Sequence, residues 1–179
     1  MTNQEMINYA LENGFKTAAV VDTTDIVFDF SFVKYCAENI CGNYGANYTC
    51  PPDCGSPEFM KEKIVAHKKA LVLESVWDIA DFSDIAAIKD AKAHHNNVSL
   101  KMAEKFSLDN HKGFVVGASN CTLCSPCLLT QNKPCAHPDI AYCCMSAYCI
   151  HVKDLAEKCG MNYAFVPGKL SLFGMYVFD

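Results

Sequence analysis

Closely spaced cysteines are the residues of this chain best able to do chemistry. The run CTLCSPC places Cys121, Cys124 and Cys127 three positions apart, and Cys135 follows further along the same loop. Such a loop can wrap a cubane iron–sulfur cluster, because each thiolate binds the iron at a different corner. The run therefore predicts a [4Fe–4S] site. In two-cluster ferredoxins the fourth cysteine of a similar run binds the other cluster, so the spacing leaves open which cluster Cys135 serves.

Zinc is the alternative for the same loop. Zinc takes four tetrahedral thiolates or imidazoles, usually from two separated pairs. Cys124, Cys127 and Cys135 with His137 would form one Cys₃His site of this kind. Three thiolates within seven residues are more typical of a cubane than of zinc. A disulfide framework is disfavoured, because the cytosol keeps thiols reduced.

A second set of cysteines lies nearer the N-terminus, in the loop at residues 36–57. Cys36, Cys41, Cys50 and Cys54 are spaced more loosely there, among glycines and prolines that favour turns. Four thiolates would hold a second cubane or a zinc ion. Three thiolates, with Cys54 left out, would leave one metal corner open to a substrate or to another protein.

The remaining four cysteines carry no metal-ligand spacing. We expect Cys143, Cys144, Cys149 and Cys159 to be buried, inert thiols, which pack as small apolar side chains. The chain has no phosphate-binding glycine loop of a common kind and no nucleophile elbow. We therefore assign no catalytic residue, and whether the protein is an enzyme stays open.

Composition limits the possible partners and compartments. The net charge is −5, and the 15 lysines and arginines are not clustered, so nucleic acid and anionic membranes are poor partners. The first residues lack the basic and continuous apolar regions of a signal peptide. No apolar run approaches the roughly 20 residues that a membrane span requires. We expect a soluble, cytoplasmic protein.

Hydrophobic periodicity predicts a single compact α+β (or α/β) domain over residues 1–179, with a mixed sheet, helices and two cysteine-rich loops at 36–57 and 119–138. The longest predicted helix covers residues 84–108. It places His95 on the apolar stripe, so we expect a core histidine there rather than a ligand. The other predicted helices are 3–13, 31–40, 57–67 and 151–159, and the predicted strands are 16–22, 26–30, 69–77, 113–118, 163–167 and 170–178.

The chain resembles a family through its two cysteine loops. The segment ICGNYGANYTCPP, with Cys41 and Cys50, is followed by CTLCSPC and then PCAHP. Together they are similar to a cysteine-rich family of predicted metal-binding proteins from anaerobic bacteria and archaea. The resemblance runs from about Cys36 to the final strand, and it implies metal or iron–sulfur binding without naming a reaction. Cys54 and the Cys143–Cys144 pair depart from the family pattern.

Three functional hypotheses follow from these observations. The first is an iron–sulfur protein with two [4Fe–4S] clusters that exchanges electrons with a redox partner protein in anaerobic metabolism. The second is a zinc-stabilised binding module without a redox role. The third is an enzyme in which one cluster keeps an open iron corner at the loop of Cys36, Cys41 and Cys50.

Overall fold

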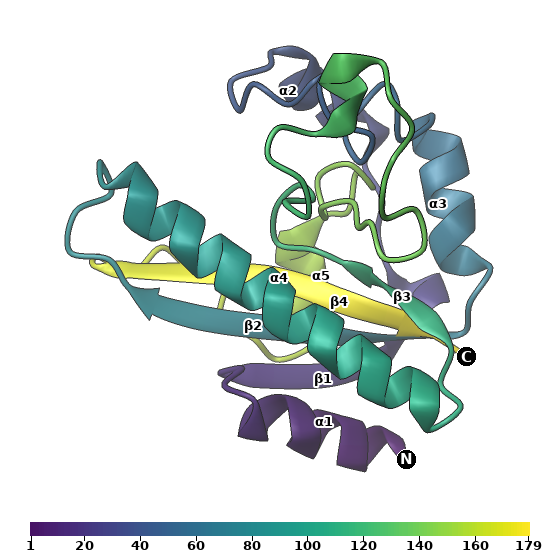
Figure 1. Cartoon of the computed structure of the whole chain (residues 1–179). Coiled ribbons are helices and arrows are strands. Elements are labelled where there is room, and N and C mark those ends of the chain that lie inside the picture. The colour runs from purple at the N-terminus through teal and green to yellow at the C-terminus, as the bar shows by residue number, and fades with distance from the viewer.

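A four-stranded sheet forms the centre of the computed structural model, which describes all residues from 1 to 179 (Figure 1). The strand order is β1-β2-β4-β3, and every neighbouring pair is antiparallel. The α+β domain is thus confirmed, but the sheet is antiparallel throughout and not mixed. The strands are β1 (Thr17–Asp22), β2 (Lys69–Asp78), β3 (Gly113–Val116) and β4 (Lys169–Phe178).

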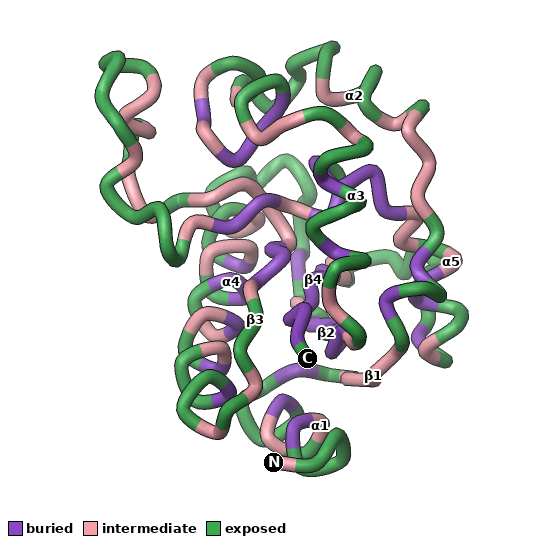
Figure 2. The backbone as a smooth tube through the Cα atoms, turned by 90° about the vertical axis from the view of Figure 1, so that its right-hand side faces the viewer, coloured by how far each residue is buried: buried purple, intermediate pink, exposed green.

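Helices cover both faces of this sheet (Figures 1 and 2). On one face, α1 (Asn3–Glu12) and α4 (Ile85–Leu108) pack against Tyr176 and Phe178 of β4. On the other face, α3 (Pro57–Val65) and α5 (Val152–Lys158) pack against Met175 and Val177. Because β4 is covered on both faces, its sequence is a nearly continuous apolar run and does not alternate with polar residues.

Local signals explain where these helices begin. Thr2 and Glu5 form a capping box at α1, in which each side chain accepts from the other's backbone N–H. Ser56 caps α3, whose first residue is Pro57, as the sequence predicts. Asp84 caps α4 through the backbone N–H of Ala87.

Two predicted strands are wrong. Residues 26–30 form a single bridge, Phe28 with Ile150, before the short helix α2 (Val33–Ala37). Residues 163–167 form no strand, and Phe165 is 77% exposed. Local β-propensity makes a strand only where a partner offers a ladder of hydrogen bonds. The main partner of β1 is the distant β2, so residues 16–22 and 26–30 do not form a hairpin.

His95 is confirmed as a core residue. It is 1% exposed, and its Nδ1 lies 2.7 Å from the hydroxyl of Ser75. The indole N–H of Trp77 donates to the same hydroxyl at 3.0 Å. Burial lowers the pKa of His95 to about 3, so the ring is neutral at neutral pH. No helix of the fold is long and apolar enough to cross a membrane.

Candidate metal centre

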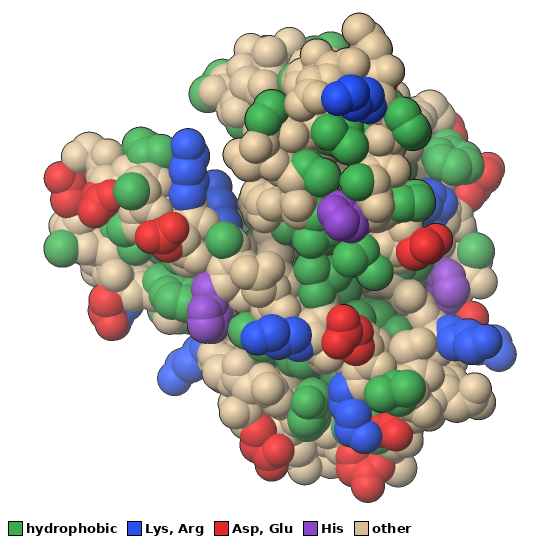
Figure 3. All heavy atoms as spheres, viewed as in Figure 1, with side chains coloured by type: hydrophobic (Ala, Val, Ile, Leu, Met, Phe, Trp, Pro, Cys, Tyr) green, Lys and Arg blue, Asp and Glu red, His purple; other side chains and the backbone are tan.

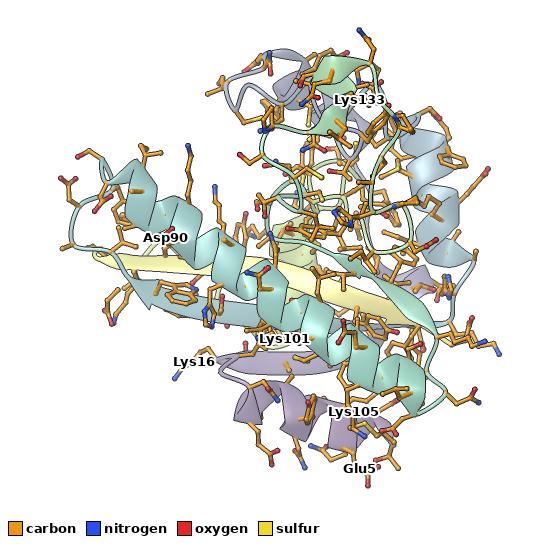
Figure 4. All side chains as sticks on the ribbon, viewed as in Figure 1. Glu5, Lys16, Asp90, Lys101, Lys105 and Lys133 are labelled. Atoms are coloured by element: carbon orange, nitrogen blue, oxygen red, sulfur yellow. The ribbon has the colours of Figure 1, made fainter.

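The two cysteine loops lie together above the β3 end of the sheet (Figure 1). Hydrogen bonds join them at several points. Asn47 donates from its side chain to the carbonyl of Cys121 at 3.0 Å, and the N–H of Cys121 donates to the hydroxyl of Thr49 at 3.2 Å. Tyr48 donates to the carbonyl of Lys133 at 2.9 Å, near the tip of the second loop (Figure 4). The two loops therefore form one unit.

The long helix α4 holds the turn that leads into the second loop. Asn96, fully buried on α4, donates to the hydroxyl of Ser119 and accepts from the N–H of Ala118, both at 2.9 Å. This turn follows directly from β3. The cysteine run beginning at Cys121 therefore follows a segment whose backbone is held by both the sheet and α4.

A cavity of about 510 Å³ adjoins the first loop, and four cysteines lie in its wall. Three of them, Cys36, Cys41 and Cys50, are candidates that the sequence predicted. The fourth is Cys144, which we had expected to be an inert thiol. The surface is hollowed between the N-terminal half of α4 and the loops, and Lys92 of α4 also lines the cavity (Figure 3).

Tertiary pairing brings Cys144 to this wall. Cys144 forms an isolated parallel bridge with Gly117, just beyond the end of β3. The N–H of Gly117 donates to the carbonyl of Cys143 at 2.9 Å, and the N–H of Met145 donates to the carbonyl of Gly117 at 3.2 Å. The large separation between Cys144 and the first loop gives no spacing signal. The one signal in the sequence was the adjacent Cys143–Cys144 pair.

Cys54 does not line the cavity. Its side chain packs against the core beside Cys143, and its sulfur lies 3.9 Å from the carbonyl of Gly55. A hydrogen bond between the two thiols lowers the pKa of Cys54 and raises the pKa of Cys143. Of the four cysteines predicted for the first site, the structure therefore gathers three around the cavity and turns the fourth toward another thiol.

The thiols around the cavity favour a positively charged occupant. Burial raises the pKa of Cys36 to about 11 and that of Cys50 to about 12, and in both cases the neighbouring thiol of Cys144 contributes to the increase. Cys41 and Cys54 contribute to both shifts as well. Thiolates so close together repel one another in a partly buried site, and a metal cation among them relieves both the repulsion and the cost of burial.

In the second loop, Cys135 lies near its own run. Burial raises the pKa of Cys121, the N–H groups of Leu123 and Tyr142 lower it, and the nearby thiols of Cys135 and Cys124 raise it further. Cys127 directly precedes the short 3₁₀ helix Leu128–Gln131. Cys135 therefore lies close to the run Cys121–Cys127 of its own loop.

His137, which the zinc alternative requires as a ligand, is exposed on the surface of the second loop. No group of three or more His, Cys, Asp or Glu side chains converges closely enough to hold a single metal ion. The thiols of the first site are instead arranged around a cavity, and cavities of roughly 300–1,000 Å³ are typical of cofactor and small-ligand sites.

The fold and the thiol-lined cavity place the chain in the class of cysteine-rich metal-binding proteins. Residues 19–178 match DUF2284, a family described as predicted metal-binding protein. The match covers most of the chain, so the chain belongs to this family, as the two cysteine loops led us to expect. No curated protein and no solved structure matches the chain.

Proposed function

We propose that this protein is an iron–sulfur protein with two [4Fe–4S] sites, one at the cavity and one in the second cysteine loop, and that it transfers electrons. The cavity of about 510 Å³ carries the proposal, because Cys36, Cys41 and Cys50 share its wall although the sequence separates them unevenly. The second site consists of Cys121, Cys124, Cys127 and Cys135. Soft thiolates in such numbers suit iron–sulfur clusters or zinc rather than hard cations.

The size of the cavity favours a cluster over a single ion. A zinc ion draws its four sulfurs to within about 2.3 Å of one point. A cubane binds each thiolate at a different iron, so its ligands stand further apart around a larger object. The thiols at the first site surround such a space.

When bound, a cubane cluster supplies reversible one-electron transfer. The protein residues hold the cluster and control its surroundings. Most residues in the cavity wall are apolar, which limits water around the metal. Ile40 and Tyr35 line the cavity and are 88% and 57% exposed, so the site reaches the surface where an electron can enter or leave. The partner we propose is a small one-electron carrier protein, and the net charge of −5 favours one with a basic docking surface.

Purification without oxygen tests this function. The protein should be brown and should contain about eight iron and about eight sulfide per chain. Reduction with dithionite should produce an electron paramagnetic resonance signal typical of reduced [4Fe–4S] clusters. A colourless protein with stoichiometric zinc would contradict the proposal and support the zinc-stabilised module.

Single substitutions separate the two sites. Cys41→Ser and Cys124→Ser should each lose about half of the iron, since each removes a ligand from a different cluster. Cys159→Ser provides the control, because Cys159 lies at the end of α5, outside the cavity wall and both loops. Its iron content should equal that of the unmodified protein.

A further inference from the structure

We propose that Cys144 is the fourth thiolate of the first site and that Cys54 is not a ligand. The inference rests on the proposed function for the identity of the cluster, but the position of Cys144 is independent of it. Cys144 lines the same cavity as Cys36, Cys41 and Cys50. The cavity wall therefore offers four thiols without any contribution from Cys54.

The backbone holds Cys144 in place. Its bridge to Gly117 attaches the segment of Cys144 to the end of β3, and Ala118 and Ser119, the next residues along, also line the cavity. Asn96 of α4 fixes those residues through two hydrogen bonds of 2.9 Å. The fourth thiol thus comes from a rigid part of the fold, whereas the other three come from the first loop.

A short turn follows Cys144 in the chain. Burial raises the pKa of this thiol, and backbone N–H groups of the following turn act in the opposite direction. The N–H of Ala147 donates to the carbonyl of Cys144 at 3.0 Å, which fixes this turn. Amides directed at a ligand sulfur stabilise the thiolate and tune the potential of a cluster.

Cys54 packs against the core and does not line the cavity. Its side chain packs against the core cluster that contains Cys143, and its sulfur lies 3.9 Å from the carbonyl of Gly55. The N–H of Cys54 donates to the carbonyl of Cys50 at 3.0 Å, so a one-turn arrangement fixes the backbone between them. Moving Cys54 into the cavity would break its contact with Cys143 and rearrange this turn.

The assignment has a consequence for the kind of chemistry. Four thiolates occupy all four iron corners of a cubane, so no corner remains for a substrate. A closed site of this kind suits electron transfer, while a site with only Cys36, Cys41 and Cys50 would suit an enzyme that binds its substrate at the fourth iron. The role of Cys144 therefore distinguishes these two functions.

The experiment compares Cys144→Ala with Cys54→Ala and Cys143→Ala after anaerobic purification. Cys144→Ala should disrupt the first cluster. If the cluster is lost, the iron content should fall to about half. If a three-iron cluster remains, the chain should lose about one iron, and the three-iron cluster should give its own paramagnetic signal. Cys54→Ala and Cys143→Ala should keep the full iron content and the spectrum of the unmodified protein. Cys143→Ala also controls for damage to the bridged segment, because Cys143 precedes Cys144 directly.

Cys144→Ser keeps the experiment decisive if the alanine variant does not fold. A serine oxygen at this corner should shift the paramagnetic signal and lower the reduction potential of one cluster, because the harder oxygen favours oxidised iron. An unchanged signal and potential in Cys144→Ser, or loss of iron in Cys54→Ala alone, would overturn the inference.

The same variants separate this inference from the proposed function. Zinc in place of iron and sulfide in the unmodified protein would refute the iron–sulfur function. The assignment of Cys144 would then be upheld by loss of one zinc in Cys144→Ala but not in Cys54→Ala, and overturned by the reverse pattern.

Discussion

Gly117 and Cys144 pair in a parallel bridge that joins the end of β3 to the segment before α5. The bridge places the Cys144 thiol in the wall of the cavity that also holds Cys36, Cys41 and Cys50. Gly117 has little room beside it. A Cβ at Gly117 would lie 2.6 Å from the ring of Tyr142 and 2.9 Å from the side-chain oxygen of Asn96.

Gly117→Ala should therefore reduce both stability and metal content at the first site. Overpacking of this kind costs about 1–3 kcal/mol in the free energy of unfolding. Displacement of the bridge would also move the Cys144 thiol, so iron per chain should fall toward half. The measurements are denaturant unfolding and iron analysis. Gly14→Ala is the control, because its added Cβ meets nothing within 4 Å and it lies between α1 and β1. The control should keep its iron, despite backbone strain at a φ of +96°.

Asn47 joins the two cysteine loops, and its loss should destabilise them together. Its side chain is 4% exposed and donates to the carbonyl of Cys121, while its oxygen accepts from the N–H and the hydroxyl of Thr49. Asn47→Ala leaves these buried groups without partners, which costs about 1–3 kcal/mol. Hydrogen exchange should become faster in both loops.

Asn8→Ala is the matched control for Asn47→Ala. Asn8 is exposed on α1, where its side chain accepts one bond from Gln4. Surface substitutions of this kind change stability by less than about 0.5 kcal/mol. Equal losses in the two variants would mean that Asn47 does not hold the loops together.

His95 should make stability depend on pH. Burial lowers its pKa to about 3 in the folded protein, against an ordinary value of 6.5. The unfolded chain therefore binds the proton more readily between these values. The contribution of the neutral ring is fully present above pH 6.5 and is lost as the pH falls toward 3, by at most about 1.4 kcal/mol per pH unit.

Urea unfolding of the protein and of His95→Gln between pH 7 and 5 measures this contribution. Trp77, the one tryptophan, provides a fluorescence signal close to the site, since its indole shares Ser75 with His95. The difference in unfolding free energy between the two proteins should shrink as the pH falls. A constant difference would show that His95 takes up its proton equally in the folded and unfolded states.

Under the proposed iron–sulfur function, Lys92 should raise the reduction potential of the cluster at the cavity. It is the one charged residue in the cavity wall, and a cationic side chain favours the reduced, more negative cluster. Lys92→Ala should lower one of the two potentials. An interaction of about 1 kcal/mol corresponds to roughly 40 mV for one electron. Redox titration followed by electron paramagnetic resonance measures the shift, and Lys92→Arg should retain the original value.

Lys101→Ala is the control for Lys92. Lys101 lies further along α4, on its exposed surface, and does not line the cavity (Figure 4). Its removal should leave both potentials within a few millivolts, because salt screens exposed charges beyond a Debye length of about 8 Å. An equal shift in both variants would indicate a general effect of net charge.

The sequence by itself determined the features that depend on local spacing. The periodicity of residues 84–108 predicted α4 and the burial of His95, and the predicted start of a helix at Pro57 matches α3, because these signals act over a few positions. The cysteine spacing predicted metal binding, and the resemblance of the two cysteine loops indicated the family to which the chain belongs.

Only the tertiary structure decided which segments pair and which thiols meet. Residues 26–30 and 163–167 have the composition of strands, but they lack partner strands, so they form none. Cys144 reaches the cavity through its bridge to Gly117, while Cys54, close in sequence to Cys50, turns toward Cys143. The physical reason is the same in both cases. Strand pairing and the walls of a cavity depend on contacts between residues distant in the chain, which local composition and spacing do not encode.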